Sequence, residues 1–414
     1  MTDAPPPPSA RKERSRLWQI DALRGLMLVL MTLTHVPTRF SSPAGQPFGY
    51  VSAAEGFVLL SAFMAGWVYT ARQRKAGVER MQSAFLKRVA KIYLSQAALL
   101  LFLFSAVAAI GLAAGQSAVT NLMSFYLQHP VEAIVGALLL VYNPPLLDIL
   151  PMYILFMLAS SLVLVHAERH GWFGLLAFSV ALWLGAQFGL GRLLYDGVVA
   201  ATGLAIPRAE TGAFEIIAWQ MLWMIGLWVG AGHAAGAPAP RFPNWLVAAA
   251  AIVAAVGFVW RHAVGQAPFG DPSLDPLFDK WQLGPLRLLD LLALLVLAMR
   301  FEPWLTRRLP RLRALELLGA ASLPVFCAHL VIALLTLAIL GEASPQRSWW
   351  LDPAILAASF AVLLAVALVS ARIDRHAARV RAAFAAARAE RQRVRELSAG
   401  ARRSPLSRSR TPPR

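Results

Sequence analysis

The chain alternates between long apolar runs and short polar segments. Each apolar run is about twenty residues long, and an α-helix of that length crosses the ~30 Å hydrocarbon layer of a bilayer. The pattern therefore predicts an all-α fold, a polytopic membrane helical bundle with about ten transmembrane helices. The expected spans are residues 18–36, 50–71, 89–112, 147–166, 172–190, 212–232, 244–261, 284–300, 317–340 and 351–371.

One further apolar stretch, residues 131–142, is shorter than the others. It lies between His129-Pro130 and Asn143-Pro144-Pro145. A run of that length rarely crosses a bilayer alone, so we expect a re-entrant or interfacial segment. If it crossed, there would be eleven spans and the C-terminus would lie outside.

The distribution of basic residues gives the orientation. Cytoplasmic loops of membrane proteins carry an excess of lysine and arginine. With ten spans and the N-terminus in the cytoplasm, the outer loops hold only six of the 39 basic residues. These six are Arg39, Arg192, Arg208, Arg261, Lys280 and Arg347. We therefore expect both termini in the cytoplasm.

Composition agrees with a membrane protein. The chain is 58% hydrophobic and 15% charged, whereas soluble domains are about half apolar and a quarter charged. Most of the formal charge of +17 lies in the C-terminal tail and the inner loops, so we expect contact with membrane lipid and no nucleic acid. The single cysteine, Cys327, lies in an apolar run, which indicates a buried thiol and excludes a disulfide framework.

The chain divides into three parts. Residues 1–17 are rich in proline and then basic, and we expect a disordered cytoplasmic segment. Residues 18–371 form the transmembrane domain. Residues 372–414 form a basic cytoplasmic tail, helical at first and disordered from Ser398 onward. The helical part either contacts anionic lipid of the inner leaflet or is a plain solvated helix, and the sequence leaves both open.

Ionisable side chains inside apolar spans are costly to bury in a membrane, so each is a candidate for function. The first span holds Asp21, Arg24 and His35. Arg24 and His35 are eleven residues apart, which places them about 20° apart around a helix and about 16 Å apart along it. They share one face, with Arg24 near the cytoplasm and His35 near the outer surface. Asp21 is spaced to pair with Arg24.

Simpler interpretations of these residues exist. Arg24 can be a membrane anchor, and His35 an interfacial histidine bonded to a carbonyl. Together they favour chemistry, because a histidine can take a proton from an attacking hydroxyl and an arginine can bind a phosphate-bearing donor. Glu55, one turn into the second span, lies at the depth of His35 and can orient its imidazole. The alternative for Glu55 is an ion pair with a residue such as Arg39.

Other polar side chains in the spans are less informative. His329 is open between a core residue and a site residue. Arg287 and Asp290 are spaced to neutralise each other, and Gln220 is expected to join helices more than to act in chemistry. Tyr153 is expected at the outer start of the fourth span.

A basic run, Lys87, Arg88 and Lys91, lies at the cytoplasmic start of the third span. It can bind the phosphates of a donor or anchor the helix. The chain has no Walker motif, dinucleotide-binding glycine pattern, HExxH or GxSxG, so metal and nucleotide-hydrolysis chemistry is not expected.

Taken in order, the polar segments resemble the OpgC-type family of the membrane acyltransferase superfamily, which modifies osmoregulated periplasmic glucans. An arginine followed after ten residues by a histidine in the first span is the superfamily pattern. The matching segments are DALRGLMLVLMTLTH (21–35), SAAEGFVLLSAFMAGWVY (52–69), FLKRVAKIY (85–93), LPMYILF (150–156), AWQMLWMIGLWVG (218–230), LGPLRLLD (283–290) and LGAASLPVFCAH (318–329).

The resemblance implies a protein of the bacterial inner membrane that moves an acyl group, typically succinyl, from cytoplasmic acyl-CoA to a hydroxyl of periplasmic glucan. Acyl-CoA is then a co-substrate, and no cofactor stays bound. On this analogy His35 is the catalytic histidine, Glu55 lies beside it and Arg24 faces the donor. The candidate substrate-binding residues are Arg24, Asp21, His329, Arg287 and Gln220.

Two other functions remain open. One is acylation of another envelope glycan, such as O-antigen or an exopolysaccharide. The other is a non-enzymatic transporter or lipid flippase, in which the buried charges line a permeation path. The absence of an obvious internal repeat weighs against a transporter built on inverted repeats. The sequence leaves the exact acyl group and the oligomeric state open.

Overall fold

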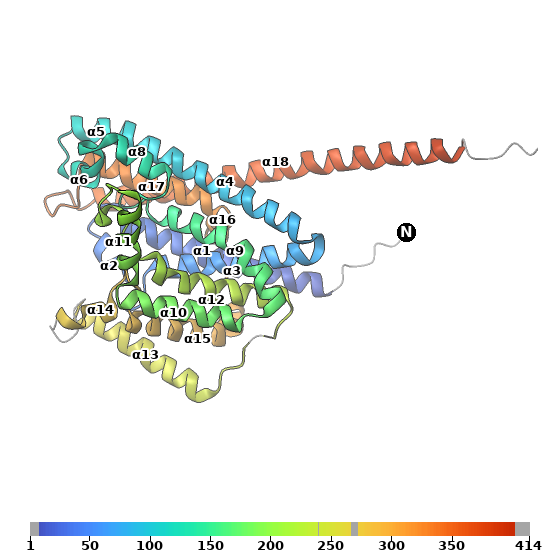
Figure 1. Cartoon of the computed structure of the whole chain (residues 1–414), viewed down its shortest axis with the longest axis horizontal. Helices are drawn as coiled ribbons and strands as arrows, with labels where there is room; N and C mark the ends of the chain where they lie inside the picture. Colours follow the sequence, from blue (N-terminus) through green and yellow to red (C-terminus); the bar gives the residue numbers. More distant parts are fainter. Residues whose placement is uncertain (1–7, 239, 266–271, 402–414) are drawn as a thin grey trace, which may run out of the picture.

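A computed structural model describes residues 8–238, 240–265 and 272–401, and within these residues it contains helices and no β-strand (Figure 1). This confirms the predicted all-α fold. Each predicted span contains one long helix. These helices are α1 (Pro8–His35), α3 (Ala53–Ala76), α4 (Val78–Phe102), α9 (Ile149–His170), α10 (Phe173–Gln187), α12 (Ile216–Ala234), α13 (Asn244–Ala263), α15 (Pro285–Arg308), α17 (Ser322–Leu340) and α18 (Leu351–Ala401).

Short helices connect the long ones. They are α2 (Ser41–Ala44), η1 (Leu103–Val107), α5 (Ala108–Ala113), α6 (Ser117–Leu122), α7 (Ser124–Gln128), α8 (Pro130–Leu138), α11 (Leu190–Thr202), η2 (Arg208–Glu210), η4 (Pro272–Leu274), α14 (Asp275–Phe278) and α16 (Arg313–Ala320). The predicted re-entrant segment contains α8, whose nine residues extend for only about 14 Å. This helix is far shorter than the hydrocarbon layer.

Fewer helices than expected qualify as spans by length and apolar composition alone. Seven described helices do so, and the pair α10 and α11, bent by 81°, gives an eighth. Helices α1 and α15 are long enough, with 28 and 24 residues, but polar and charged side chains reduce their apolar character. Both belong to the bundle, because α1 packs on α3, α16 and α17, and α15 packs on α13 and α14.

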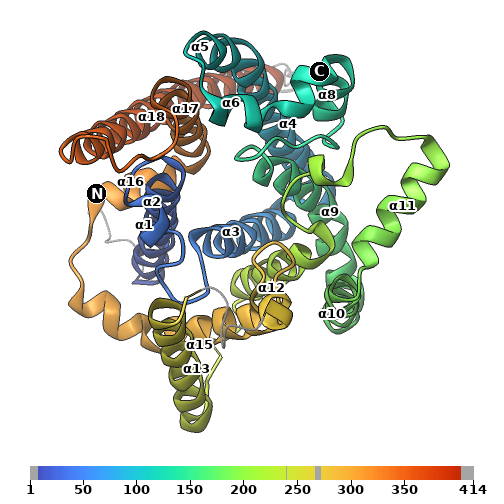
Figure 2. The ribbon, with the colours of Figure 1, turned by 90° about the vertical axis from the view of Figure 1, so that its left-hand side faces the viewer.

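Helix α3 runs through the middle of the bundle, with α1, α4, α9, α12, α15 and α17 around it (Figure 2). Helices α10, α13 and α18 lie further out. We call the end at which α18 leaves the bundle the tail end, and the opposite end, where α2, α6 and α14 lie, the loop end (Figure 1).

The termini differ in part from the prediction. Helix α1 begins at Pro8, before the predicted start at residue 18, and α18 continues without a break to Ala401. The predicted disorder of residues 1–7 and 402–414 lies outside the described residues. Helix α18 projects straight away from the bundle (Figure 1). The contact of its basic part with membrane lipid stays a prediction.

Glycines bring α1 and α16 into backbone contact. A Cβ atom on Gly319 would overlap the carbonyl oxygen of Asp21, and one on Gly25 would overlap the carbonyl oxygen of Leu315. Small residues of this kind let membrane helices approach closely. The contact fixes the part of α1 that carries Arg24.

We therefore expect Gly319→Ala to lower the stability of the bundle by about 1–3 kcal/mol, because the added methyl group has no space. The measurement is thermal unfolding of the purified protein in detergent. The matched control is Gly174→Ala in α10, where a Cβ meets nothing within 4 Å. Equal behaviour of the two variants would contradict the prediction.

Candidate active site

Two histidines meet inside the bundle near the loop end. The Nδ1 atom of His35, the last residue of α1, lies 3.1 Å from Nε2 of His329 in α17. The rings are stacked with centroids 5.3 Å apart. His329 is fully buried, whereas His35 is partly exposed. His35 is therefore the member of the pair that a substrate can reach.

The hydrogen bond between the rings constrains their tautomers. A neutral imidazole has one donor and one acceptor nitrogen. If Nδ1 of His35 donates to His329, the Nε2 atom of His35 carries a lone pair and makes no hydrogen bond to a described residue. His35 can then accept a proton, and His329 stabilises the cation that forms by accepting from it.

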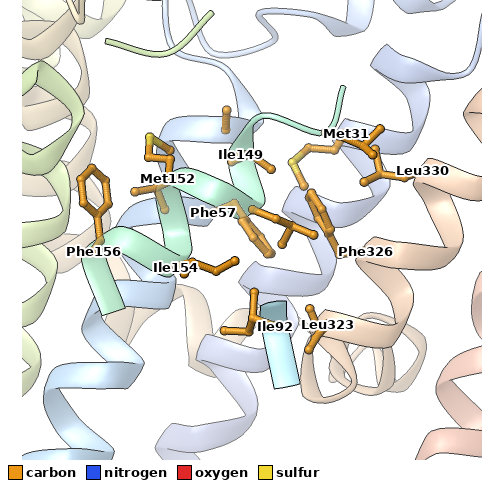
Figure 3. Close-up of a cluster of buried hydrophobic side chains, with 14 of the residues drawn as sticks. Met31, Phe57, Ile92, Ile149, Met152, Ile154, Phe156, Leu323, Phe326 and Leu330 are labelled. Carbon is orange, nitrogen blue, oxygen red and sulfur yellow. The ribbon is translucent and has the colours of Figure 1, made fainter. Parts of the chain in front are cut away.

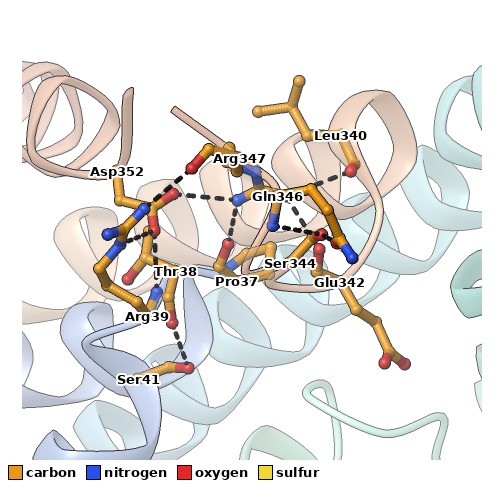
Figure 4. Close-up of polar contacts among 10 residues, drawn as sticks. All are labelled: Pro37, Thr38, Arg39, Ser41, Leu340, Glu342, Ser344, Gln346, Arg347 and Asp352. Atoms are coloured by element: carbon orange, nitrogen blue, oxygen red, sulfur yellow. Dashed lines mark hydrogen bonds and ion pairs between the residues drawn. The ribbon is translucent and has the colours of Figure 1, made fainter. Parts of the chain in front are cut away.

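A polar cluster fixes the helix ends that carry this pair (Figure 4). The guanidinium of Arg347 donates to the carbonyl of Pro37, two residues after His35, at 2.7 Å, and to the carbonyl of Leu340 at the end of α17 at 3.2 Å. It also pairs with the buried carboxylate of Asp352 at 3.2 Å. One arginine therefore ties the end of α1 to the end of α17.

Glu55 does not contact His35 in the way the sequence predicted. Its carboxylate accepts hydrogen bonds from the backbone N–H and hydroxyl of Ser52, which form a capping box at the start of α3. The other oxygen lies 2.5 Å from Nη1 of Arg287 in α15. The alternative partner, Arg39, pairs with Asp352 instead. The alternative expectation, an ion pair with an arginine, is therefore met, but the partner is Arg287 from a helix far away in sequence and not Arg39.

The expected pairing of Arg287 with Asp290 is also not formed. Arg287 is fully buried and, besides Glu55, donates from Nε to the carbonyl of Phe278 at 3.0 Å. Asp290 instead accepts from the backbone N–H of Tyr50 at 3.0 Å. The two side chains therefore point to different partners, Arg287 to α3 and Asp290 to the segment before α3 and to Gly257 of α13.

Arg24 is buried on the same side of α1 as His35, since both contact α17. Its guanidinium donates to the hydroxyl of Ser322 and lies 3.8 Å from the carboxylate of Asp21. It lines a narrow cavity of about 20 Å³. The lining residues are Arg24, Phe57, Ser61, Arg88, Ile92, Leu150, Tyr153, Ser322, Leu323 and Phe326.

Several side chains that line this cavity belong to a cluster of buried apolar residues, among them Phe57, Leu323 and Phe326 (Figure 3). Phe57 and Phe326 line the cavity and stack at 5.6 Å between ring centroids. Phe326 also lies edge-on to the ring of His329 at 4.8 Å. A molecule that moves from Arg24 to His35 must therefore displace these aromatic side chains.

The three basic residues of the third span that were candidates for binding donor phosphates lie in different surroundings in the structure. Arg88 lines the cavity with Arg24. Lys87 lines a different hollow, at the surface between α3 and α4, together with Arg72 and Arg80. Lys91 is exposed and lines neither space. Adjacent residues on a helix point about 100° apart, which separates Lys87 from Arg88, whereas Lys91 lies one turn beyond Lys87 along the helix.

Gln220 joins two helices and is not part of the site. Its amide nitrogen donates to the carbonyl of Ser179 in α10 at 2.8 Å, and its oxygen accepts from the Ser179 hydroxyl at 2.8 Å. Both ends of the amide are therefore engaged. This confirms the interpretation of Gln220 as a residue that joins helices.

Two site residues were not found from the sequence. Tyr153 was expected at the outer start of a span, yet it lines the Arg24 cavity, because the preceding loop is buried and bonded through Leu147 to Gln96 inside the bundle. Lys280 was expected only as an outer-loop cation. It lies close enough to His35 for electrostatic interaction. Its neighbours in the sequence, Asp279 and Trp281, give no signal of this position.

Fold and site together define a polytopic membrane protein with a histidine-centred polar site inside its bundle. The family model described as OpgC protein matches residues 16–375, which is most of the chain. The chain belongs to the OpgC family, as its polar segments predicted, and at that level it is a membrane acyltransferase that modifies a glucan. No curated protein and no solved structure matches it.

Proposed function

We propose that the protein transfers a succinyl group from cytoplasmic acyl-CoA to a hydroxyl of periplasmic glucan across the bacterial inner membrane. The tail end of the bundle then lies in the cytoplasm with both termini, and the loop end faces the periplasm. The distribution of basic residues supports this orientation. Coenzyme A is anionic and too polar to cross a bilayer, so donor and acceptor meet inside the protein.

The observation that carries the proposal is the bond between His35 and His329 on helices that also hold Arg24 and Ser322. The acceptor hydroxyl gives its proton to Nε2 of His35 as its oxygen attacks the thioester carbonyl. The C–S bond breaks as the ester forms, and the proton passes to the departing thiolate. The reaction leaves an acylated glucan, free coenzyme A and neutral His35.

The donor side is supported by Arg24 and Arg88, which line the same cavity at the inner part of the bundle. Two guanidinium groups suit the phosphates of an anionic donor. The acyl chain then leads towards His35 past Phe57 and Phe326. Because the cavity is narrow, donor entry requires these rings to rotate, and this step is a conformational gate in the proposal.

The direct test supplies membranes that contain the protein with labelled succinyl-, acetyl- or malonyl-CoA and purified glucan. Transfer of label to glucan, greatest with succinyl-CoA, is expected. Label on lipopolysaccharide or exopolysaccharide instead of glucan would move the assignment to another envelope glycan. Movement of a glycan or lipid by purified protein in liposomes, without any acyl donor and without acylation, would support a transporter and contradict the proposal.

A further inference from the structure

Side chains from three helices hold the loop between α14 and α15 in place. The backbone carbonyls of this loop, and that of Phe278 at the end of α14, accept hydrogen bonds from side chains on α10, α12 and α15. The pairs are Trp183 with Leu283 (3.0 Å), Gln187 with Gln282 (2.9 Å), Trp219 with Lys280 (3.2 Å) and Arg287 with Phe278 (3.0 Å). Because Arg287 also holds Glu55, the loop is tied to the polar centre of the bundle.

Lys280 is the cation that this loop presents. Its ammonium lies 4.6 Å from the centroid of the Trp281 ring. Among the described residues, no carboxylate lies within the 4.0 Å of an ion pair. It nevertheless interacts electrostatically with Glu55 and with Asp148, and with His35.

The carboxylates near Lys280 are already engaged. Glu55 pairs with Arg287, and Asp148 accepts from the backbone N–H of Ala213 at 3.1 Å. Burial lowers the pKa of Lys280, because the protein replaces water around the ammonium without supplying a close counter-ion. An anionic group that bound beside Lys280 would favour its charged form.

The direction of the acyl chain in the site decides which anionic group can reach Lys280. In the proposed reaction the thioester carbonyl lies at His35 and coenzyme A lies towards the tail end. The far end of the acyl group must then point towards the loop end, where Lys280 lies. A neutral acetyl group offers nothing to this cation, whereas a dicarboxylic acyl group ends in a carboxylate.

We propose that Lys280 binds the distal carboxylate of the transferred acyl group and so makes the enzyme select acyl groups of dicarboxylic acids over neutral ones. This inference rests on the proposed function. It assigns to one residue of the α14–α15 loop the choice between succinyl and acetyl donors. Lys280 acts in it as a specificity-determining residue, separate from the proton transfer at His35.

The test compares Lys280→Met with the wild type, using succinyl-CoA and acetyl-CoA with the same glucan. The ratio of kcat/KM for the two donors is measured, because effects on the acceptor cancel in it. A lost charge-assisted hydrogen bond corresponds to about a tenfold to hundredfold fall in the succinyl-to-acetyl ratio. Acetyl transfer by Lys280→Met should persist, because an acetyl group has no carboxylate for Lys280 to bind, and this activity also shows that the variant is folded.

Lys280→Arg keeps the positive charge and is expected to retain most of the preference for succinyl. Lys280→Gln, which keeps the position polar, should lose the preference as Lys280→Met does. Equal loss with both donors, or an unchanged ratio in both neutral variants, would overturn the assignment of Lys280. Failure of the proposed function has a different result, since the wild type would then transfer neither acyl group to glucan.

Discussion

Replacing His35 with asparagine is expected to reduce acyl transfer to glucan by about 10²–10⁴-fold, the usual contribution of a general base. Asparagine keeps a polar side chain of similar size but cannot accept a proton near neutral pH. His35 is partly exposed and bonded to His329 at 3.1 Å, so the substitution removes the accessible basic nitrogen of the site. Mass spectrometry of purified glucan measures the substituents, and an immunoblot of membranes measures the amount of protein.

The matched control is His170→Asn, the same change at an exposed position at the tail end of α9, which should leave transfer unchanged. His329→Asn is expected to cause a smaller loss than His35→Asn, because His35 keeps its basic nitrogen but loses its partner. Full substitution of the glucan in a His35→Asn strain with normal protein levels would contradict the catalytic assignment of His35.

The sequence predicted well what depends on local spacing. Apolar runs located every long helix, because a helix must satisfy its own backbone in lipid. The spacing of Arg24 and His35 placed them on one face of a helix, and in the structure both contact α17. The stretch at residues 131–142 was predicted not to span a bilayer because it is short, and its helix α8 has only nine residues. Each of these features is decided within a few turns of one helix.

What the sequence could not predict is the pairing between distant helices. Glu55 and Arg287 are 232 positions apart, and nothing near either residue indicates the other. The nearby candidates, Arg39 for Glu55 and Asp290 for Arg287, were wrong because side-chain reach and helix packing decide the partner. His329 was ambiguous for the same reason, since its partner His35 lies on another helix.

The sequence also did not predict which loops pack into the bundle. Tyr153 was expected at the start of the fourth span and does lie in the first turns of α9, but the sequence did not indicate that the loop before α9 folds into the bundle, with Asn143 and Asp148 both buried. Lys280 was counted as a loop cation on the positive-inside argument, although side chains from three helices fix its loop. Loop residues gain roles from contacts that hydropathy does not describe.

The pair of Glu55 and Arg287 yields the largest expected effect on stability. Both side chains are completely buried and joined at 2.5 Å. Arg287→Met leaves the carboxylate of Glu55 without its counter-charge, and breaking a buried pair in this way costs about 3–5 kcal/mol. The expected result is a marked fall in the thermal unfolding temperature in detergent, or loss of the protein from the membrane.

The double variant Glu55→Gln/Arg287→Met tests the cause. It removes both charges, so it should be more stable than Arg287→Met alone, with a coupling energy that a double-mutant cycle measures. The control is Arg192→Met. Arg192 forms an ion pair with Asp196 on α11 that is exposed at both ends, so losing it should lower the free energy of unfolding by less than about 1 kcal/mol. If the double variant is as unstable as the sum of its single changes, Glu55 and Arg287 act independently, and their pairing does not hold α3 to α15.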